Sequence, residues 1–254
     1  MIVFQLTLRG FMDNQKYSIV HLESPYETLG VTEGQIYFSK ILACRLKSYQ
    51  QRYGKRVFPF GAEDFLSDIV AIQRNSDQQI VATFKYVSYN SCQNFSVEFP
   101  LNHTFQNPIN DKFPREIVSN WMFEKENSNK QFAYMGSFTN TQDFGQTIKE
   151  RRMIKDLITT AIVGIILSKK IDHVIVTGII PNGASNYIQW LGFEKLCEEI
   201  VLVKDINQSP ANVLILNQIS KDSLALYDKY RFFWDERNCI RNVETVIREK
   251  DEAA

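Results

Sequence analysis

The sequence predicts an α/β (α+β) fold in which helices flank a mixed, mostly antiparallel sheet. Apolar runs at 69–72 and 80–84 enclose a polar turn, a pattern typical of a β-hairpin. A long apolar helix is expected at 148–169, and the buried run that follows it at 174–176 is typical of a parallel strand. A hairpin together with a strand–helix–strand crossover indicates a sheet that contains both kinds of strand pairing.

A single domain is expected over residues 1–254, because the sequence contains no internal repeat, no low-complexity tract and no Gly/Ser-rich linker. Hydrophobic residues make up 44% of the chain, which is enough for a sizeable core. Lys plus Arg and Asp plus Glu each number 29, so the formal net charge is zero. This balance argues against partners recognised through bulk charge, such as nucleic acid or an anionic membrane. No apolar run approaches the ~20 residues that a membrane span requires.

The cysteines and histidines are scattered along the chain and predict neither a disulfide framework nor a metal site. Neither CxxC nor HExxH occurs in the sequence. The isolated cysteines, with no signal-peptide pattern at the N-terminus, indicate a reducing, cytoplasmic setting. The residues concerned are Cys44, Cys92, Cys197, Cys239, His21, His103 and His173.

The first 60 residues are expected to form an extension of strands and one helix in front of the main sheet. Short strands are predicted at 2–8 and 17–22, on either side of a polar turn. Apolar residues then recur at steps of three and four from Ile36 until Gly54, which predicts a helix that ends at this glycine.

The middle of the chain is expected to contain a long loop and two further strands. Residues 90–114 contain three prolines and several asparagines, which favours a loop that shapes an opening above the sheet. Strands are predicted at 116–123 and 131–138, separated by a charged turn.

The last third of the chain predicts a short helix, a closing pair of strands and a C-terminal helix. The short helix occupies 181–192, and the strands lie at 200–203 and 213–216. The helix at 220–250 is rich in aromatic residues from Tyr227 to Trp234. That aromatic stripe indicates either packing against the protein's own sheet or an exposed interaction surface.

The segment from Tyr187 to Glu194 ends its helix at Gly192 and returns to the sheet at Phe193, as any helix-to-strand corner can. Together with the order strand, polar turn, long helix, strand and short helix over 131–216, it resembles the GNAT superfamily of acyl-CoA-dependent N-acyltransferases. The resemblance implies a central pair of parallel strands that splay apart and leave room for the pantetheine arm of an acyl-CoA.

The polar turn before the long helix resembles the loop with which this superfamily binds the pyrophosphate of the cofactor. The resemblance implies that Gln142, Gly145 and Thr147 surround the phosphates with backbone N–H groups at the helix start. Arg151 and Arg152 would add positive charge. The alternative is an ordinary helix N-cap followed by solvated basic residues.

Aminolysis of a thioester needs a neutral amine, a hydrogen-bond donor for the developing oxyanion and a route for two protons. The backbone near Gly136 and Ser137 is the candidate donor, since a glycine in mid-strand is consistent with a bulge or a close approach. Asn182 and Ser185 are candidates for contact with the pantetheine arm, although each also suits a helix cap.

Two side chains are candidates for proton transfer. Glu116 is the candidate base, acting directly or through water, and the alternative is a solvent-facing carboxylate on an edge strand. Tyr187 is the candidate acid for the leaving thiolate, as the superfamily resemblance implies, and the alternative is a core tyrosine.

Within the superfamily, the order of elements is similar to that of the autoinducer (acyl-homoserine-lactone) synthases and the long-chain N-acyl amino acid synthases. The resemblance rests on Arg45 and Arg56, on the acidic segment 63–68 and on the late strand region 207–217. Asn120 stands where those synthases have an arginine, so an acceptor other than a homoserine lactone precursor is expected.

The sequence therefore predicts an N-acyltransferase that moves an acyl group from acyl-CoA, or from an acyl carrier protein, to the amine of a small molecule or an amino acid. The alternative is a non-catalytic protein of the same fold that binds a ligand or a partner. The sequence leaves the carrier protein and a homodimer open.

Overall fold

The computed structural model describes residues 16–53, 60–105, 112–128, 130–141, 145, 147–197, 199–202 and 209–242. Several predicted features lie outside the described residues. They are the strand at 2–8, the helix end at Gly54, Arg56, Gln142, Asn207 and the part of the expected C-terminal helix beyond residue 242.

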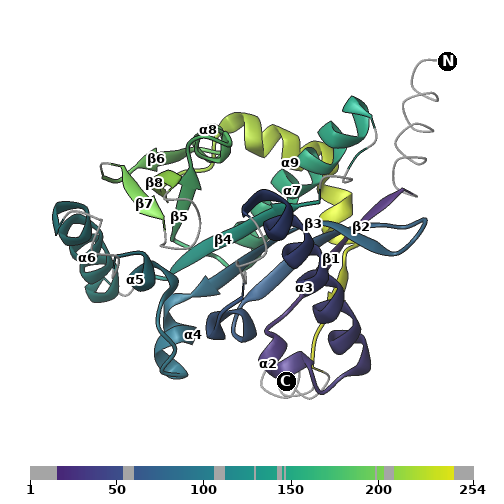
Figure 1. The fold of residues 1–254 in the computed structure, drawn as a ribbon, viewed down its shortest axis with the longest axis horizontal. Coiled ribbons are helices and arrows are strands. Elements are labelled where there is room, and N and C mark those ends of the chain that lie inside the picture. Colours follow the sequence, from purple (N-terminus) through teal and green to yellow (C-terminus); the bar gives the residue numbers. More distant parts are fainter. Residues whose placement is uncertain are drawn as a thin grey trace.

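The described strands form a mixed sheet in the order β6-β8-β5-β4-β3-β2-β1-β9, with β7 paired to β8 (Figure 1). Two neighbouring pairs are parallel, the central β4–β5 pair and the β1–β9 pair, and the other pairs are antiparallel. The strands are β1 (Tyr17–Leu22), β2 (Asp68–Arg74), β3 (Gln79–Ser88), β4 (Phe132–Asn140), β5 (His173–Ile179), β6 (Phe193–Lys195), β7 (Ile200–Leu202), β8 (Ser209–Leu216) and β9 (Asn238–Ile240).

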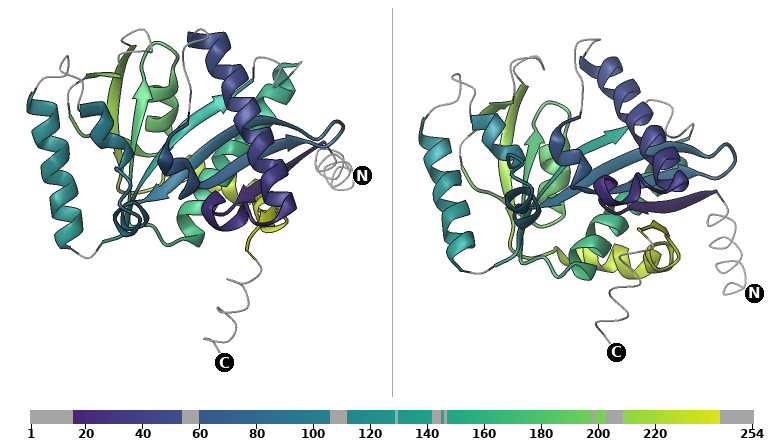
Figure 2. Two further views of the ribbon diagram at one scale, coloured as in Figure 1. Left: turned by 60° about the horizontal axis from the view of Figure 1, so that its bottom comes forward. Right: turned by 90° about the horizontal axis from the view of Figure 1, so that it is seen from below.

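Helices cover both faces of this sheet, with α3 on one face and α7 and α9 on the other (Figure 2). A short 3-10 helix, Ala62–Phe65, precedes β2. The helices are α2 (Pro25–Thr28), α3 (Thr32–Tyr53), α4 (Tyr89–Asn94), α5 (Pro100–Phe105), α6 (Lys112–Asn127), α7 (Ile148–Ser168), α8 (Ala184–Trp190) and α9 (Lys221–Asp235). None of the described helices combines the length and the apolar character that crossing a bilayer requires.

The central helix α7 follows directly from local sequence. Thr147 caps it by accepting a hydrogen bond from the Glu150 N–H, and the Glu150 carboxylate accepts one from the Thr147 N–H. Most of its last four turns are buried between the sheet and α9, as the apolar spacing predicted.

The close crossing of α7 and α9 depends on Gly164, which lies beneath the ring of Trp234. A Cβ atom at Gly164 would lie 2.4 Å from the Trp234 ring, so we expect Gly164→Val to lower the free energy of unfolding by about 3 kcal/mol through overpacking. Gly30→Val is the control, because an added Cβ there meets nothing within 4 Å, and its expected effect is below about 0.5 kcal/mol. Urea unfolding of both variants measures this difference, and equal midpoints would contradict it.

Two predictions for the middle of the chain were wrong. Within 90–114 the structure has α4 and α5 and the first turn of α6, because Ser88 caps α4 and Pro100 occupies the first position of α5. The strand expected at 116–123 is the body of α6. Its buried residues Val118 and Trp121 are three apart, which is a helical spacing.

The C-terminal helix is shorter than expected and is followed by an unexpected strand. It ends at Asp235, and the chain then adds β9 alongside β1. Tyr227, Phe233 and Trp234 are buried in the core formed with α7, so this part of the aromatic stripe packs against the protein itself. The other predicted elements in the described residues were confirmed, with boundaries that differ by a few residues.

Candidate functional site

The two central parallel strands separate after a short paired segment. β4 and β5 are in register only from Phe132 opposite His173 to Tyr134 opposite Ile175. Beyond this point both strands continue, to Asn140 and Ile179, without pairing to each other, and Figure 1 shows them fanning apart. The fork leaves one edge of β4 without a strand partner among the described residues. The carbonyl oxygens of Ser137 and Asn140 in this part of β4 accept side-chain hydrogen bonds from Thr139 and Ser48.

A β-bulge on β4 lies directly beyond the fork. Thr83 is opposite Thr139 and Lys85 is opposite Gly136. Between these two pairs, Phe84 of β3 faces two residues of β4, Ser137 and Phe138. The first of these, Ser137, has φ 54°, a left-handed conformation that is rare for residues other than glycine. The predicted irregularity near Gly136 is therefore present, and it lies in the part of β4 that no longer pairs with β5.

An inner cavity of about 300 Å³ opens on one side of the fork, between α3, β3, β4 and β5. Its polar groups include the Glu63 carboxylate, the Lys85 ammonium and the hydroxyls of several tyrosines. The lining residues are Ser48, Tyr49, Arg52, Tyr53, Glu63, Lys85, Pro100, Tyr134, Gly136, Ser137, Phe138, Thr177, Ile179, Asn182, Ala184 and Ile188.

A second cavity of about 530 Å³, which we call the cationic cavity, adjoins the first at the start of α7. Four residues line both cavities: Arg52, Phe138, Asn182 and Ala184. The cationic cavity also contains Arg151, Arg152 and Lys155, and no Asp or Glu among the described residues lines it. Its positive charge suits an anionic group such as a diphosphate.

The other predicted phosphate-binding residues in the described part of the chain, Gly145 and Thr147, lie at the start of α7. The Thr147 hydroxyl is engaged in capping α7, as the alternative interpretation proposed. Gly145 lies against Arg151, where an added Cβ would be 2.8 Å from the Arg151 backbone nitrogen. Neither Gly145 nor Thr147 lines a cavity, whereas Arg151 and Arg152 do.

A buried network of four charged side chains adjoins the inner cavity, and two of its members, Glu63 and Lys85, line that cavity. Arg45 forms an ion pair with Asp64, and both side chains are fully buried. Lys85 donates hydrogen bonds to Asp64 Oδ2 at 2.9 Å and to Glu63 Oε1 at 2.7 Å. Burial alone would raise the pKa of Asp64, but Lys85, Arg45 and the Gly61 N–H outweigh burial and lower it. The network therefore carries two positive and two negative charges.

Lys85 is a functional candidate that sequence analysis missed. It is only 4% exposed, in the middle of a strand whose other residues are almost all apolar. A lysine at such a position is costly unless it is paired. A lysine in the middle of an apolar strand was therefore the signal in the sequence that could have identified Lys85. The sequence could not identify Glu63 and Asp64 as its partners.

The predicted acid, Tyr187, lies on the cationic side of the fork. Its hydroxyl is 2.7 Å from the Thr159 hydroxyl, and its ring stacks on Trp190 with Lys155 above the ring. Burial raises the pKa of Tyr187. Tyr187 therefore has both a structural partner in α7 and a place in the lining of the cationic cavity.

The two candidates for contact with the pantetheine arm differ in position. Asn182 lines both cavities, and its side-chain oxygen accepts a hydrogen bond from the N–H of Ala184, the first residue of α8, whose N-cap is Gly183. Ser185 is 2% exposed, bonded to Asn212 and Gln189, and lines neither cavity. Ser185 thus connects α8 to β8.

The predicted base, Glu116, is separated from the other candidates. It lies on α6, where it is exposed, and it lines neither cavity. Its expected place on a strand was wrong, because 116–123 is helical. The carboxylate that the fold brings to the inner cavity belongs to Glu63.

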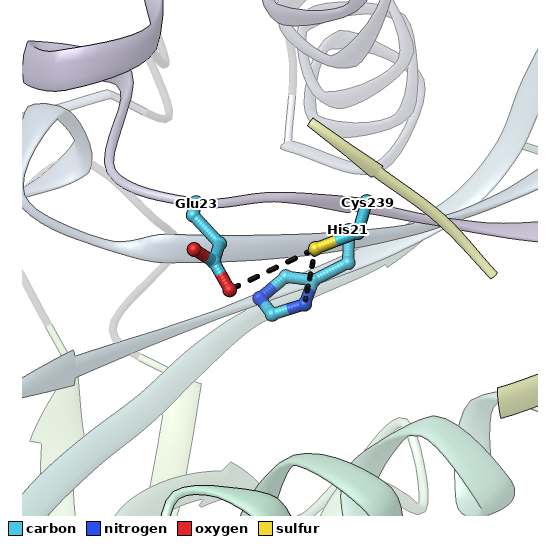
Figure 3. Close-up of side chains that lie close together, drawn as sticks. All are labelled: His21, Glu23 and Cys239. Atoms are coloured by element: carbon cyan, nitrogen blue, oxygen red, sulfur yellow. Dashed lines mark hydrogen bonds between the residues drawn. The ribbon is translucent and has the colours of Figure 1, made fainter. Parts of the chain in front are cut away.

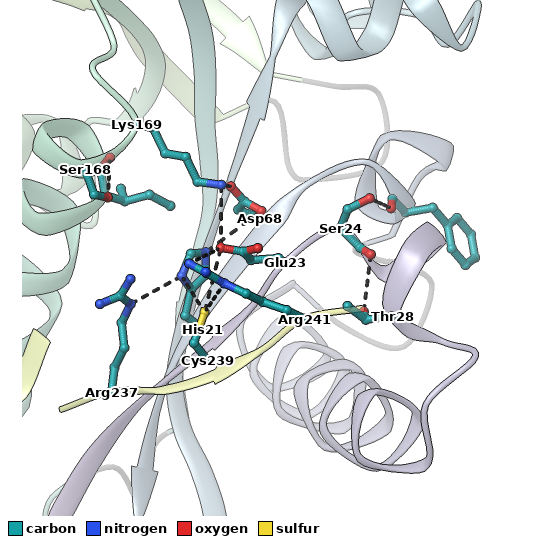
Figure 4. A network of polar contacts seen from close by, with 12 residues as sticks. His21, Glu23, Ser24, Thr28, Asp68, Ser168, Lys169, Arg237, Cys239 and Arg241 are labelled. Atoms are coloured by element: carbon teal, nitrogen blue, oxygen red, sulfur yellow. Dashed lines mark hydrogen bonds and ion pairs between the residues drawn. The ribbon is translucent and has the colours of Figure 1, made fainter. Parts of the chain in front are cut away.

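A second polar cluster lies away from the fork, where β9 joins β1. Side-chain atoms of His21, Glu23 and Cys239 lie within 4.8 Å of one another, a spacing that metal ligands can have (Figure 3). Arg237 donates to His21 Nδ1 at 3.4 Å, and Arg241 contacts both the Cys239 thiol and the Glu23 carboxylate (Figure 4). Arg237 and Arg241 thus bond to all three members of the cluster, while His21 Nε2 has no hydrogen-bond partner among the described residues. The cluster joins β9 to β1.

Burial in this cluster lowers the pKa of His21 to about 3, so the imidazole is neutral in ordinary buffers. Lys169 adds an ion pair with Asp68 at 3.0 Å. The sequence could not reveal this cluster, because its members come from opposite ends of the chain.

No family model matches the sequence. No curated protein matches it either. The solved structure of BjaI, a CoA-dependent acyl-homoserine lactone synthase with SAM and isopentyl-CoA, is similar at a TM-score of 0.50 and 12% identity, covering 84% of this chain and 89% of that chain.

Two other solved structures are similar at slightly lower TM-scores. FeeM, an N-acyl amino acid synthase from uncultured soil microbes, has a TM-score of 0.47 and 13% identity, covering 85% of this chain and 98% of that chain. The AHL synthase LasI has a TM-score of 0.48 and 12% identity, covering 82% of this chain and 93% of that chain. At such identities the likeness concerns the fold, and the predicted GNAT-like sheet with its splayed central pair is confirmed.

Proposed function

We propose that this protein is an N-acyltransferase that transfers an acyl group from a thioester to the amine of a small molecule or an amino acid. The observation that carries the proposal is the fork between β4 and β5, which opens into a cationic cavity on one side and an inner cavity with a carboxylate on the other. A thioester placed in the fork would have its phosphates on one side and an amine on the other.

The cationic cavity supports a donor that carries phosphate. Arg151, Arg152, Lys155 and Arg52 can hold a diphosphate, and a pantetheine arm can reach the bulge of β4 through the fork. The fold similarity to BjaI, whose solved structure contains isopentyl-CoA, favours acyl-CoA as the donor. A phosphopantetheine carried by an acyl carrier protein has the same reactive arm.

In the inner cavity, Glu63 is the base that the geometry favours. It takes a proton from the ammonium form of the acceptor, and Lys85 holds its carboxylate in place. The neutral amine attacks the thioester carbonyl carbon, and the carbonyl π electrons move to oxygen. When the carbonyl re-forms, the C–S bond breaks and its electron pair leaves on sulfur. The amine loses one further proton and the thiolate gains one, which gives an amide and a free thiol.

A thiol-release assay tests this function. The full chain is incubated with acyl-CoA thioesters of different chain lengths and a panel of amines and amino acids. We expect release of free CoA thiol that depends on both substrates, with the N-acyl product identified by mass spectrometry. Tight binding of the thioesters without thiol release would instead support the non-catalytic alternative.

The cationic cavity makes a specific prediction for the donor. We expect Arg151→Ala with Arg152→Ala to raise the KM for acyl-CoA about 100-fold, because each lost hydrogen bond to a charged group is worth about 1.5 kcal/mol. Steady-state kinetics measure the change. Acyl-pantetheine, which lacks the diphosphate, is the control substrate and should be unaffected.

The control variant is Arg231→Ala, whose guanidinium forms an exposed pair with Asp235 on α9. If the double variant and this control have the same KM for acyl-CoA, the cationic cavity does not bind the donor.

A further inference from the structure

Two tyrosine–threonine pairs lie on opposite sides of the fork. Tyr134 on β4 pairs with Thr177 on β5, with 3.1 Å between the hydroxyl oxygens. Tyr187 on α8 pairs with Thr159 on α7 at 2.7 Å. Each hydroxyl has one proton to donate. The other hydrogen-bond partners of each pair therefore decide which of the two tyrosines can donate a hydrogen bond to a substrate.

The Tyr187 pair has no proton left for a ligand. The Thr159 hydroxyl donates to the Lys155 carbonyl at 3.0 Å, one turn earlier in α7. The 2.7 Å contact then requires the Tyr187 hydroxyl to donate to Thr159. The proton of Tyr187 therefore points into α7.

In the Tyr134–Thr177 pair, by contrast, one of the two hydroxyl protons remains available to a ligand. Among the described residues, the Thr177 hydroxyl has no other hydrogen-bond partner than Tyr134. Thr177 can therefore donate to the Tyr134 oxygen, which leaves the Tyr134 proton free to point into the inner cavity that both residues line. Burial raises the pKa of Tyr134 to about 12, partly offset by the bond to Thr177, so the hydroxyl stays protonated in any practical assay buffer.

The position of the Tyr134 hydroxyl matches the reacting centre that the fork implies. Tyr134 is the last β4 residue that pairs with β5, and Thr177 lies two residues beyond its partner Ile175. The Tyr134 side chain folds over Gly136, where an added Cβ would lie 2.8 Å from the hydroxyl oxygen. The hydroxyl thus lies beside the backbone that leads into the Ser137 bulge.

We propose that the Tyr134 hydroxyl donates a hydrogen bond to the thioester carbonyl oxygen as that oxygen becomes the oxyanion, and that Thr177 is the positioning residue that orients it. This inference rests on the proposed acyltransferase function. It adds a side-chain donor to the backbone donor expected near Ser137, and such donors act most strongly in a site shielded from water. No proton is transferred by Tyr134, so Glu63 remains the base.

The first test compares Tyr134→Phe with the wild-type chain. We expect kcat to fall about 100-fold, as for the loss of one oxyanion donor, while the KM for acyl-CoA changes less than about threefold. Tyr89→Phe is the matched control, because the Tyr89 hydroxyl contacts Glu126 outside both cavities. Thermal unfolding of each variant verifies that it is folded.

Thr177 provides a second test that separates positioning from structure. Thr177→Val removes the donor to Tyr134, and we expect a loss of kcat close to that of Tyr134→Phe. Thr177→Ser keeps a hydroxyl and should recover most of the activity. The double variant Tyr134→Phe/Thr177→Val should be no worse than Tyr134→Phe alone, because Thr177 acts only by orienting the Tyr134 hydroxyl, which Tyr134→Phe has already removed.

A spectroscopic measurement tests the inference without requiring turnover. Acyl-CoA with a ¹³C-labelled carbonyl is bound to the full chain without acceptor, and its infrared stretching frequency is recorded. In the wild type the hydrogen bond should lower this frequency, and in Tyr134→Phe the frequency should return toward the value for free acyl-CoA.

Unchanged frequency and unchanged kcat in folded Tyr134→Phe would overturn the inference while leaving the acyltransferase function intact. A wild-type chain that neither binds nor turns over acyl-CoA would overturn the function itself.

Discussion

Replacing Asp64 by asparagine is expected to lower the free energy of unfolding by about 3–5 kcal/mol. Asp64 is fully buried between Arg45 and Lys85, and its carboxylate is the acceptor that both cations share. An amide keeps the shape of the side chain but removes the charge. Arg45 would then lie in the interior without an anion, and two of its nitrogens already have no hydrogen-bond partner among the described residues. Urea unfolding at pH 7 measures the loss.

The pH dependence gives this prediction a second measurement. The pKa of Asp64 is below its ordinary value of 3.8 in the folded state, so its contribution to stability is present above pH 3.8 and is lost as the pH falls through the lower, folded-state pKa. The stability difference between wild type and Asp64→Asn should therefore shrink below about pH 4.

Asp77→Asn is the control for this change, because Asp77 pairs with Arg74 on the surface. Its expected cost is below about 1 kcal/mol. If both variants lose the same stability at pH 7, the buried network does not depend on the charge of Asp64.

Replacing Glu63 by glutamine is expected to lower kcat by about 10²–10⁴-fold, the usual contribution of a general base. Glu63 is the carboxylate in the inner cavity, and Lys85 holds it by a hydrogen bond of 2.7 Å. Glutamine has nearly the same shape but cannot accept the proton of the acceptor amine. Steady-state kinetics with a saturating acyl-CoA measure kcat, and binding of acyl-CoA should be retained.

The Glu116→Gln variant tests whether Glu116 or Glu63 is the base. The sequence predicted Glu116 as the base, but the structure places it exposed on α6 and outside both cavities. We expect Glu116→Gln to keep nearly full activity. Loss of activity in Glu116→Gln with normal activity in Glu63→Gln would contradict the assignment of the base to Glu63.

Local patterns were enough to predict much of the fold. The hairpin of β2 and β3, the capped and buried helix α7, and the parallel strand after it each follow from side-chain periodicity and turn or cap residues within one segment. The wrong assignment of α6 has a physical cause. Its core contains β-branched and aromatic residues that suit either structure, and only burial at helical spacing against the sheet decides between them.

The sequence by itself determined most strands of the sheet, although not β9, and the basic residues at the start of α7, because these depend on neighbours along the chain. Only the tertiary structure decided which polar groups meet at the fork. Glu63 and Lys85 are 22 residues apart, and Tyr134 and Thr177 are 43 apart. Their proximity depends on strand register and on where β4 and β5 diverge. These are properties of the packed sheet, which no single segment of the sequence encodes.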